Sequence, residues 1–152
     1  MHPISEDDPR RPDVTELLEA HLALMRSLSP PESVHALDLD GLTASDVTFW
    51  TLREEGRVFA CGALKSLDGK HCEIKSMHTA EAARGRGLAD AMLRHILLEA
   101  RARGMARISL ETGRPDTFAP AQRLYARQGF TECPPFADYT DDPFSLCMTR
   151  TL

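Results

Sequence analysis

Apolar side chains recur with a helical period near the start of the chain. They are spaced three or four positions apart over residues 14–27, directly after Pro12 and Asp13. This spacing places them on one helix face, and Asp13 is a residue type that caps helix starts, so the pattern predicts an amphipathic helix. Residues 29–32, of sequence SPPE, repeat the capping pattern with proline at the first helical position. This repeat predicts a second, short helix over residues 31–37.

Runs of β-branched and aromatic residues then mark three consecutive strands. Residues 47–52 and 58–64 form two such runs, and a polar, glycine-containing turn at residues 54–57 separates them. This arrangement predicts a β-hairpin. A second polar turn, at residues 66–70, leads into a third apolar stretch over residues 72–79. The three runs together predict an antiparallel meander.

The period becomes helical again in the second half of the chain. Two adjacent rows of apolar residues run along residues 87–103, and a short alternating segment follows at residues 106–112. Together with the strand before them, they predict one βαβ unit with a parallel strand pair. Another helix is predicted over residues 118–128, and residues 130–133 and 145–152 are predicted to be closing strands.

Length, composition and charge narrow the class of protein. The chain has 152 residues, of which 42% are hydrophobic, enough for one packed domain over residues 1–152. Its formal charge of −5 argues against a protein that binds nucleic acid or a membrane surface. Residues 84–127 nevertheless carry nine basic and four acidic side chains, a local excess of +5. A phosphate-bearing ligand near this segment is therefore compatible with an acidic protein.

The sequence indicates neither export, nor membrane insertion, nor a metal site. The first residues are polar and acidic, without the basic and apolar regions of a signal peptide, and the apolar runs are too short to span a bilayer. The four cysteines are scattered without zinc-site spacing; they are Cys61, Cys72, Cys133 and Cys147. We therefore expect a cytoplasmic protein with four reduced thiols and no metal.

Residues 84–89, of sequence RGRGLA, lie between a predicted strand and the longest predicted helix. Glycines let the backbone approach a ligand, the first N–H groups of a helix are unpaired, and arginines add positive charge. The segment is therefore a candidate pyrophosphate site, and the alternative is a glycine-rich connection with solvated arginines. A dinucleotide fingerprint fits less well, because Asp90 stands where its third glycine belongs and antiparallel strands precede the motif.

This segment and a second block together resemble the GNAT acetyltransferase superfamily. The acetyl-CoA signature of that family, Arg/Gln-x-x-Gly-x-Gly/Ala at a helix start, is similar to residues 84–89. Residues 121–130, of sequence AQRLYARQGF, look like the family's last helix and its ending, and the likeness extends over about residues 43–152. The resemblance implies an α/β (α+β) fold: a mixed, mostly antiparallel sheet of about six to seven strands, about four helices, and one parallel βαβ unit at the cofactor site.

The resemblance also implies a cofactor and the residues that hold it. Acetyl-CoA would bind as cosubstrate, with its pyrophosphate at the helix start and its pantetheine arm along the preceding strand, like an added strand. Backbone N–H groups of that strand would hold the thioester oxygen. The implied cofactor-binding residues are Met77, His78, Thr79, Arg84, Gly85, Arg86, Gly87, Leu88, Ala89, Phe118, Ala121 and Tyr125.

The reaction implied by the family needs a base and an acid. A primary amine with a pKa near 10.4 is protonated at neutral pH, so a base must free its lone pair. Glu73 matches the family's acidic position, His78 titrates in a suitable range, and Glu111 or a water molecule are further candidates. Tyr125 matches the family's tyrosine, which protonates the leaving thiolate. Each of these residues also has a purely structural interpretation. Glu73 could pair with Lys75, His78 could be packed or solvent-exposed, and Tyr125 could belong to the core.

Three functions fit these features. The first is an acetyl-CoA-dependent N-acetyltransferase that acts on a primary amine of a small molecule or peptide. The second is a non-catalytic acyl-CoA-binding regulatory module on the same fold, and the third is a nucleotide-binding domain. If the acidic N-terminal part and the loop at residues 138–142 border the acceptor-binding cleft, their negative charge predicts a cationic acceptor. The alternative is that these charges are solvated and keep the protein soluble. Both a monomer and a homodimer fit the sequence.

Overall fold

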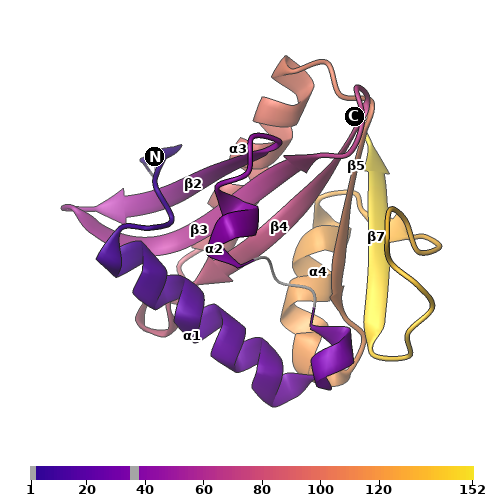
Figure 1. Cartoon of the computed structure of the whole chain (residues 1–152), viewed down its shortest axis with the longest axis horizontal. Coiled ribbons are helices and arrows are strands. Elements are labelled where there is room, and N and C mark those ends of the chain that lie inside the picture. Colours follow the sequence, from indigo (N-terminus) through magenta and orange to yellow (C-terminus); the bar gives the residue numbers. More distant parts are fainter. Residues whose placement is uncertain (1–2, 35–37) are drawn as a thin grey trace.

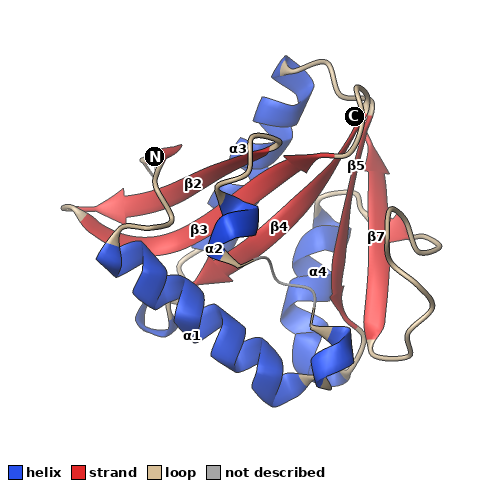
Figure 2. Ribbon diagram, in the orientation of Figure 1, coloured by secondary structure: helices blue, strands red, loops and turns tan. Residues whose placement is uncertain are grey.

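The computed structural model describes residues 3–34 and 38–152 and places helices against both faces of one sheet (Figures 1 and 2). The strands are β1 (Ile4–Glu6), β2 (Val47–Glu54), β3 (Arg57–Ser66), β4 (His71–Thr79), β5 (Arg107–Gly113), β6 (Thr131–Glu132) and β7 (Ser145–Thr151). The helices are α1 (Pro12–Leu28), α2 (Leu39–Leu42), α3 (Leu88–Ala102) and α4 (Ala119–Arg127), with 3-10 turns η1 (Pro31–Ser33), η2 (Glu81–Ala83) and η3 (Asp116–Phe118). No helix in this part of the chain is long and apolar enough to cross a membrane.

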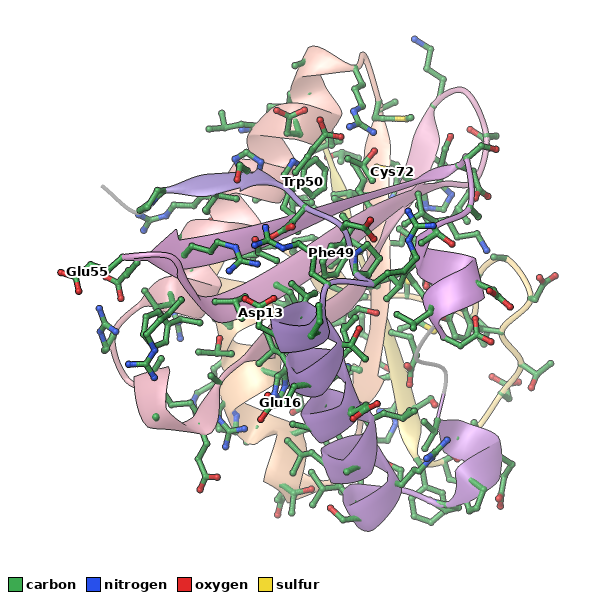
Figure 3. All side chains as sticks on the ribbon, turned by 60° about the vertical axis from the view of Figure 1, so that its left-hand side comes forward. Asp13, Glu16, Phe49, Trp50, Glu55 and Cys72 are labelled. Carbon is green, nitrogen blue, oxygen red and sulfur yellow. The ribbon has the colours of Figure 1, made fainter. Side chains whose placement is uncertain are left out.

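The strand order in the sheet is β1-β2-β3-β4-β5-β7-β6. Neighbouring strands are antiparallel except β4 and β5. This confirms the predicted mixed sheet, the meander of β2, β3 and β4, and the parallel pair joined through α3. The β2–β3 hairpin turns at Glu55 and Gly56, with φ angles of 51° and 79°, which suit the twist of a two-residue turn. Glu55 points away from the sheet at the tip of this hairpin (Figure 3).

β4 and β5 are paired over a short stretch and then separate. Residues 71–73 pair with residues 107–109, whereas β4 continues to Thr79 and β5 to Gly113. Figure 1 shows the two strands running apart toward their C-terminal ends, with α4 behind them. Residues of both strands, among them Ser76 of β4 and Glu111 of β5, line one cavity.

A bulge in β4 lies beside this opening. Gly62 of β3 stands opposite two residues of β4, Ser76 and Met77. Ser76 has a φ of 55°, in the left-handed region, and the Cys61 thiol donates a hydrogen bond to the Ser76 carbonyl oxygen at 3.2 Å. A bulge changes the direction of the side chains that follow it, here Met77 and His78.

The helices divide the core between the two faces of the sheet. α1 and α2 cover one face, where Val14 and Leu17 of α1 and Leu42 of α2 pack with Phe49. α3 and α4 cover the other face, where Trp50 belongs to a larger cluster. Phe49 and Trp50 are neighbours in β2 and point to opposite faces, as strand geometry requires (Figure 3). The amphipathic helices predicted over residues 14–27, 87–103 and 118–128 are confirmed.

The N-terminal region differs most from the sequence prediction. The helix predicted over residues 31–37 is a 3-10 turn, η1, at Pro31–Ser33, and residues 35–37 lie outside the described residues. β1 is too short for a periodic signal, and it forms by pairing with β2. α2 begins where the Asp38 carboxylate accepts a hydrogen bond from the Gly41 N–H at 2.9 Å. It has four residues, fewer than a sequence pattern needs to identify a helix.

Candidate active site

A groove follows the end of β4, the start of α3 and one side of α4. All but one of the residues that the family resemblance implies for cofactor binding line this groove; the exception is Arg86. The lining includes Met77, His78, Thr79, Arg84, Gly85, Gly87, Leu88, Ala89, Phe118, Ala121 and Tyr125. The fold thus brings three separate segments of the sequence to one surface.

The start of α3 presents backbone donors to the groove. Gly85 and Gly87 have φ angles of 81° and 77°, and a Cβ on either would meet no described atom within 4 Å. No side chain in residues 3–34 and 38–152 caps α3, so its first N–H groups stay available at the positive end of the helix. Arg84 lines the groove next to them. This combination suits a phosphate group.

Arg86 lies outside the groove. Its guanidinium pairs with the Glu54 carboxylate, with Nη2 2.6 Å from Oε1, and its Cζ lies 5.6 Å from the centroid of the Phe59 ring. Its part in cofactor binding stays a prediction, and Arg86 would have to leave Glu54 to take it. Arg123 and Arg127 of α4 line the groove instead, and Asp90 of α3, which also lines it, pairs with Arg127 at 3.1 Å. The positive charge at this surface therefore comes from the arginines of α4, from Arg84 and from the positive end of α3.

A second cavity lies where β4 and β5 separate. Ser76 and Glu111 line it from the two strands, and Tyr139 lines it from the loop before β7. Through Tyr139, the loop at residues 138–142 borders this cavity, which is one of the two interpretations of that loop. The cavity shares six residues with the groove, namely His21, Met25, Met77, Phe118, Ala121 and Tyr125. The two spaces therefore meet, and Tyr125 lies at their junction.

The end of β5 holds the start of α4 at this junction. A Cβ at Gly113 would overlap the ring of Phe118, so the absence of a side chain lets this ring pack against the strand. Gln122 Nε2 donates a hydrogen bond to the Gly113 carbonyl oxygen at 2.7 Å. These contacts place the first turn of α4 against β5, and Tyr125 follows on the next turn.

Tyr125 supplies a buried phenol. The residue is 7% exposed, and its ring packs edge-on against Phe130 with centroids 5.8 Å apart. Burial, and then the nearby Glu111 carboxylate, raise the pKa of Tyr125 well above its ordinary value. The phenol is therefore protonated at neutral pH and can act as a proton donor.

Glu73 belongs to a hydrogen-bonded group beside the second cavity. Its Oε2 accepts hydrogen bonds from the Tyr139 hydroxyl at 2.5 Å and from the Lys75 ammonium at 3.3 Å. Lys75 Nζ also donates to the Tyr139 oxygen at 2.8 Å. Glu73 is 3% exposed. The pairing with Lys75 considered in the sequence analysis is present, and Tyr139 adds a second donor to the same carboxylate oxygen.

Glu111 has a different environment. Burial raises the pKa of Glu111 to about 7, although the Ser145 hydroxyl and the Lys75 ammonium oppose this shift. The side chain lines the cavity that meets Tyr125. A carboxyl group with a pKa near 7 is partly ionised at neutral pH and can accept a proton there.

His78 and His21 form a pair between β4 and α1. Their Nδ1 atoms are 3.1 Å apart and their ring centroids 4.8 Å apart. Burial lowers the pKa of His21 to about 4. Burial, followed by the electrostatic effects of His21 and Arg84, lowers the pKa of His78 to about 3. Both rings are therefore neutral at pH 7, and one Nδ1 donates a hydrogen bond to the other.

His21 is a site residue that the sequence pattern does not indicate. It is the one polar residue among the buried positions of α1, which include Val14 and Leu17, and only the packing of α1 against the sheet brings it to the junction. Within the described ranges, no three His, Cys, Asp or Glu side chains gather where they could hold a metal ion.

Known proteins are similar to this chain in sequence and in fold. The model of the Acetyltransferase (GNAT) family matches residues 14–130. YsnE of Bacillus subtilis (strain 168), an uncharacterized N-acetyltransferase, is 47% identical over 152 residues, which is 100% of both chains. A crystal structure from Klebsiella pneumoniae has a TM-score of 0.85 and 27% identity, covering 100% of this chain and 98% of its own. A GNAT family acetyltransferase from Elizabethkingia anophelis, solved with acetyl-CoA bound, has a TM-score of 0.71 and 17% identity over 99% and 98% of the two chains. This chain belongs to the GNAT family of acetyltransferases.

Proposed function

We propose that this protein is an acetyl-CoA-dependent N-acetyltransferase that transfers the acetyl group to a primary amine by direct attack on the thioester. The observation that carries the proposal is the meeting of the groove and the second cavity at Tyr125, with Glu111 lining the cavity side. A cosubstrate in the groove and an acceptor in the cavity would meet at this point. The acetyl-CoA bound to the neighbour from E. anophelis supports the choice of cosubstrate.

The groove offers a place for each part of acetyl-CoA. The pyrophosphate would accept hydrogen bonds from the N–H groups at the start of α3, next to Arg84. The pantetheine arm would pair with residues 77–79 of β4, which have no β5 partner because the strand pairing ends at Glu73. The thioester would then reach Tyr125, where backbone N–H groups of the β4 bulge could hold its oxygen.

We propose Glu111 as the general base, ahead of Glu73 and His78. A base works best when its pKa is close to the working pH, and the pKa of Glu111 is raised to about 7 by burial. The Glu73 carboxylate already accepts hydrogen bonds from two donors, so it has less capacity for a substrate proton. His78 has a pKa lowered to about 3, which makes it a weak base at neutral pH.

We propose Tyr125 as the general acid. When the tetrahedral intermediate collapses, the C–S bond breaks and a thiolate leaves, and the protonated phenol would donate its proton to that sulfur. An ammonium acceptor loses two protons on the way to the amide. Glu111 would take the first and release it to solvent, and it would take the second from the nitrogen of the tetrahedral intermediate, which balances the proton that Tyr125 gives up. Proton exchange with solvent would then restore both groups for the next turnover.

The charges around the second cavity favour a cationic acceptor. Glu73 and Glu111 contribute negative charge against the single ammonium of Lys75, and His21 is neutral. Asp142, in the loop before β7, adds a further negative charge near Glu111. The acceptor we propose is therefore a primary amine that arrives as a cation, on a small molecule or a peptide.

The proposed function is tested with the wild-type protein. Calorimetry should detect acetyl-CoA binding, and release of free thiol should follow when members of a panel of amines, polyamines and peptides are added. Binding without turnover across the whole panel would favour a non-catalytic acyl-CoA-binding module. Displacement of acetyl-CoA by a dinucleotide that binds more tightly would favour the nucleotide-binding alternative.

Glu111→Gln should lower kcat/KM for the acceptor by about 10²–10⁴-fold, because the base is removed. In the wild type the ionised carboxylate is active, so kcat/KM should rise with pH through a pKa of about 7. The variant should lose this dependence near pH 7. The measurement is a pH–rate profile at saturating acetyl-CoA.

Two further variants complete that experiment. Glu99→Gln removes a carboxylate that pairs with Arg103 on the surface of α3, and it should behave like the wild type. Glu73→Gln should retain the rise of kcat/KM with pH near pH 7. If this rise disappears in Glu73→Gln and persists in Glu111→Gln, the assignment of the base to Glu111 is wrong.

A further inference from the structure

Ser76 combines two unfavourable features at the edge of the second cavity. Its Oγ is buried and has no hydrogen-bond partner among the described residues, and the whole residue is 9% exposed. Its backbone has a φ of 55°, a conformation that costs energy for any residue with a Cβ and that usually favours glycine or asparagine. Ser76 also lines the cavity.

The packing of the fold does not account for the hydroxyl. A buried hydroxyl without a partner destabilises the folded state relative to an apolar side chain of similar size. The contact that holds the bulge is made by the Ser76 carbonyl oxygen, which accepts from the Cys61 thiol at 3.2 Å. The side chain takes no part in that contact. Strained and unsatisfied groups of this kind concentrate at functional sites.

Two other residues in the described ranges, His95 and Ser145, have buried side-chain polar atoms of a comparable kind, and their positions differ from that of Ser76. His95 Nε2 is on α3, where the ring packs edge-on against Trp50 at a centroid distance of 5.2 Å. Ser145 Oγ is at the start of β7, where it acts on the pKa of the Glu111 carboxyl group. Neither residue lines the second cavity, whereas Ser76 lies next to Met77, which lines both the cavity and the groove. Ser76, with its unsatisfied hydroxyl, therefore belongs to the wall of the space where an acceptor would approach the thioester.

We infer that Ser76 is an acceptor-binding residue whose Oγ accepts a hydrogen bond from the attacking nitrogen. A primary amine that has lost one proton keeps two N–H groups and a lone pair. One N–H bound by Ser76 would orient the lone pair toward the thioester carbon, while Glu111 serves as the base. This inference rests on the proposed acetyltransferase function and extends it to the residue that positions the nucleophile.

Ser76→Ala tests this inference because it removes only the hydroxyl and keeps the Cβ and its backbone strain. It should lower kcat/KM for the best acceptor of the amine panel by about 10–100-fold, as expected for a lost hydrogen bond to a reacting nitrogen. The Kd for acetyl-CoA should stay within about twofold, because no cosubstrate contact is lost. The melting temperature should stay equal or rise, because an unpaired buried hydroxyl is gone.

Ser109→Ala is the matched control. Ser109 is 1% exposed, and its Oγ lies 2.7 Å from His71 Nε2 and 2.8 Å from Thr149 Oγ1. Removing this hydroxyl leaves partners unpaired, so the melting temperature should fall while kcat/KM per folded molecule stays close to the wild-type value. Ser76→Gly provides a second test, since glycine adopts the left-handed conformation easily and should lose the same activity.

The outcomes separate this inference from the proposed function. Equal kcat/KM in wild type, Ser76→Ala and Ser76→Gly would overturn the role of Ser76 and leave the acetyltransferase proposal standing. A fall in melting temperature in Ser76→Ala as large as that of Ser109→Ala would assign the hydroxyl a structural role and also overturn it. Wild-type protein that fails to bind acetyl-CoA would contradict the proposed function itself, and the inference about Ser76 with it.

Discussion

Gly87→Glu is expected to abolish acetyl-CoA binding, with a loss of at least about 100-fold in affinity. Gly87 is the N-cap of α3 and has a φ of 77°, which a residue with a side chain adopts at a cost. The new carboxylate would lie beside the N–H groups from which the pyrophosphate is proposed to accept hydrogen bonds. It would compete for those donors and repel the phosphates. Calorimetry with acetyl-CoA measures this loss directly.

Gly104→Glu is the control for the backbone effect of that substitution. Gly104 follows the other end of α3, and its φ is 76°, with no described atom within 4 Å of an added Cβ. The two variants therefore pay a similar conformational cost, but Gly104 does not line the groove. Gly104→Glu should lower the melting temperature to a similar extent and bind acetyl-CoA with unchanged Kd. If Gly87→Glu binds as well as this control, the phosphate site is not at the start of α3.

Tyr125→Phe is expected to lower kcat by about 10²–10⁴-fold and to leave the Kd for acetyl-CoA within about twofold. Phenylalanine keeps the ring that packs against Phe130 and removes the only atom that could protonate the leaving sulfur from this position. Because the pKa of Tyr125 is raised by burial, the wild-type phenol stays protonated across the neutral range. Single-turnover measurements of thiol release should therefore show a slower chemical step and normal binding.

Tyr139→Phe is the comparison for that variant, because Tyr139 is the other of the two tyrosines in the chain. It removes the hydroxyl that donates to Glu73, away from the junction. Tyr139→Phe should change the KM for the acceptor more than it changes kcat. An unchanged kcat in Tyr125→Phe, or an equal fall of kcat in both variants, would argue against Tyr125 as the general acid.

The elements with long periodic patterns are the ones that sequence analysis predicts best. The apolar rows of α3 and the β-branched runs of β2, β3 and β4 are local signals, and the structure confirms each of them. β1 and α2 carry no such signal, because a three-residue strand and a four-residue helix depend on the partner they pack against. The short helix expected at residues 31–37 shows the reverse error: the proline-rich capping signal is present, but it is followed by a 3-10 turn at Pro31–Ser33.

Some residues of the candidate site could be predicted from the sequence and others could not. The RGRGLA segment and the block around Tyr125 are each a continuous stretch of sequence, and they line the groove, apart from Arg86. Arg86 could not be separated from Arg84 by sequence, because its position depends on the Glu54 carboxylate, which lies far away in the chain on β2. His21 likewise reaches the junction only because α1 crosses the sheet beside His78.

The sequence by itself determined the secondary-structure elements with strong periods, the position of the proposed phosphate-binding segment and the family, because these depend on residues close together in the chain. Only the tertiary structure decided which acidic residue is held in an ion pair and which has a raised pKa. Glu73 and Glu111 are both carboxylates on neighbouring strands, but Lys75 and Tyr139 contact the first, whereas burial is the largest cause that raises the pKa of the second to about 7. The unsatisfied hydroxyl of Ser76 is likewise a property of the packed fold, since burial and hydrogen bonding depend on residues distant in sequence.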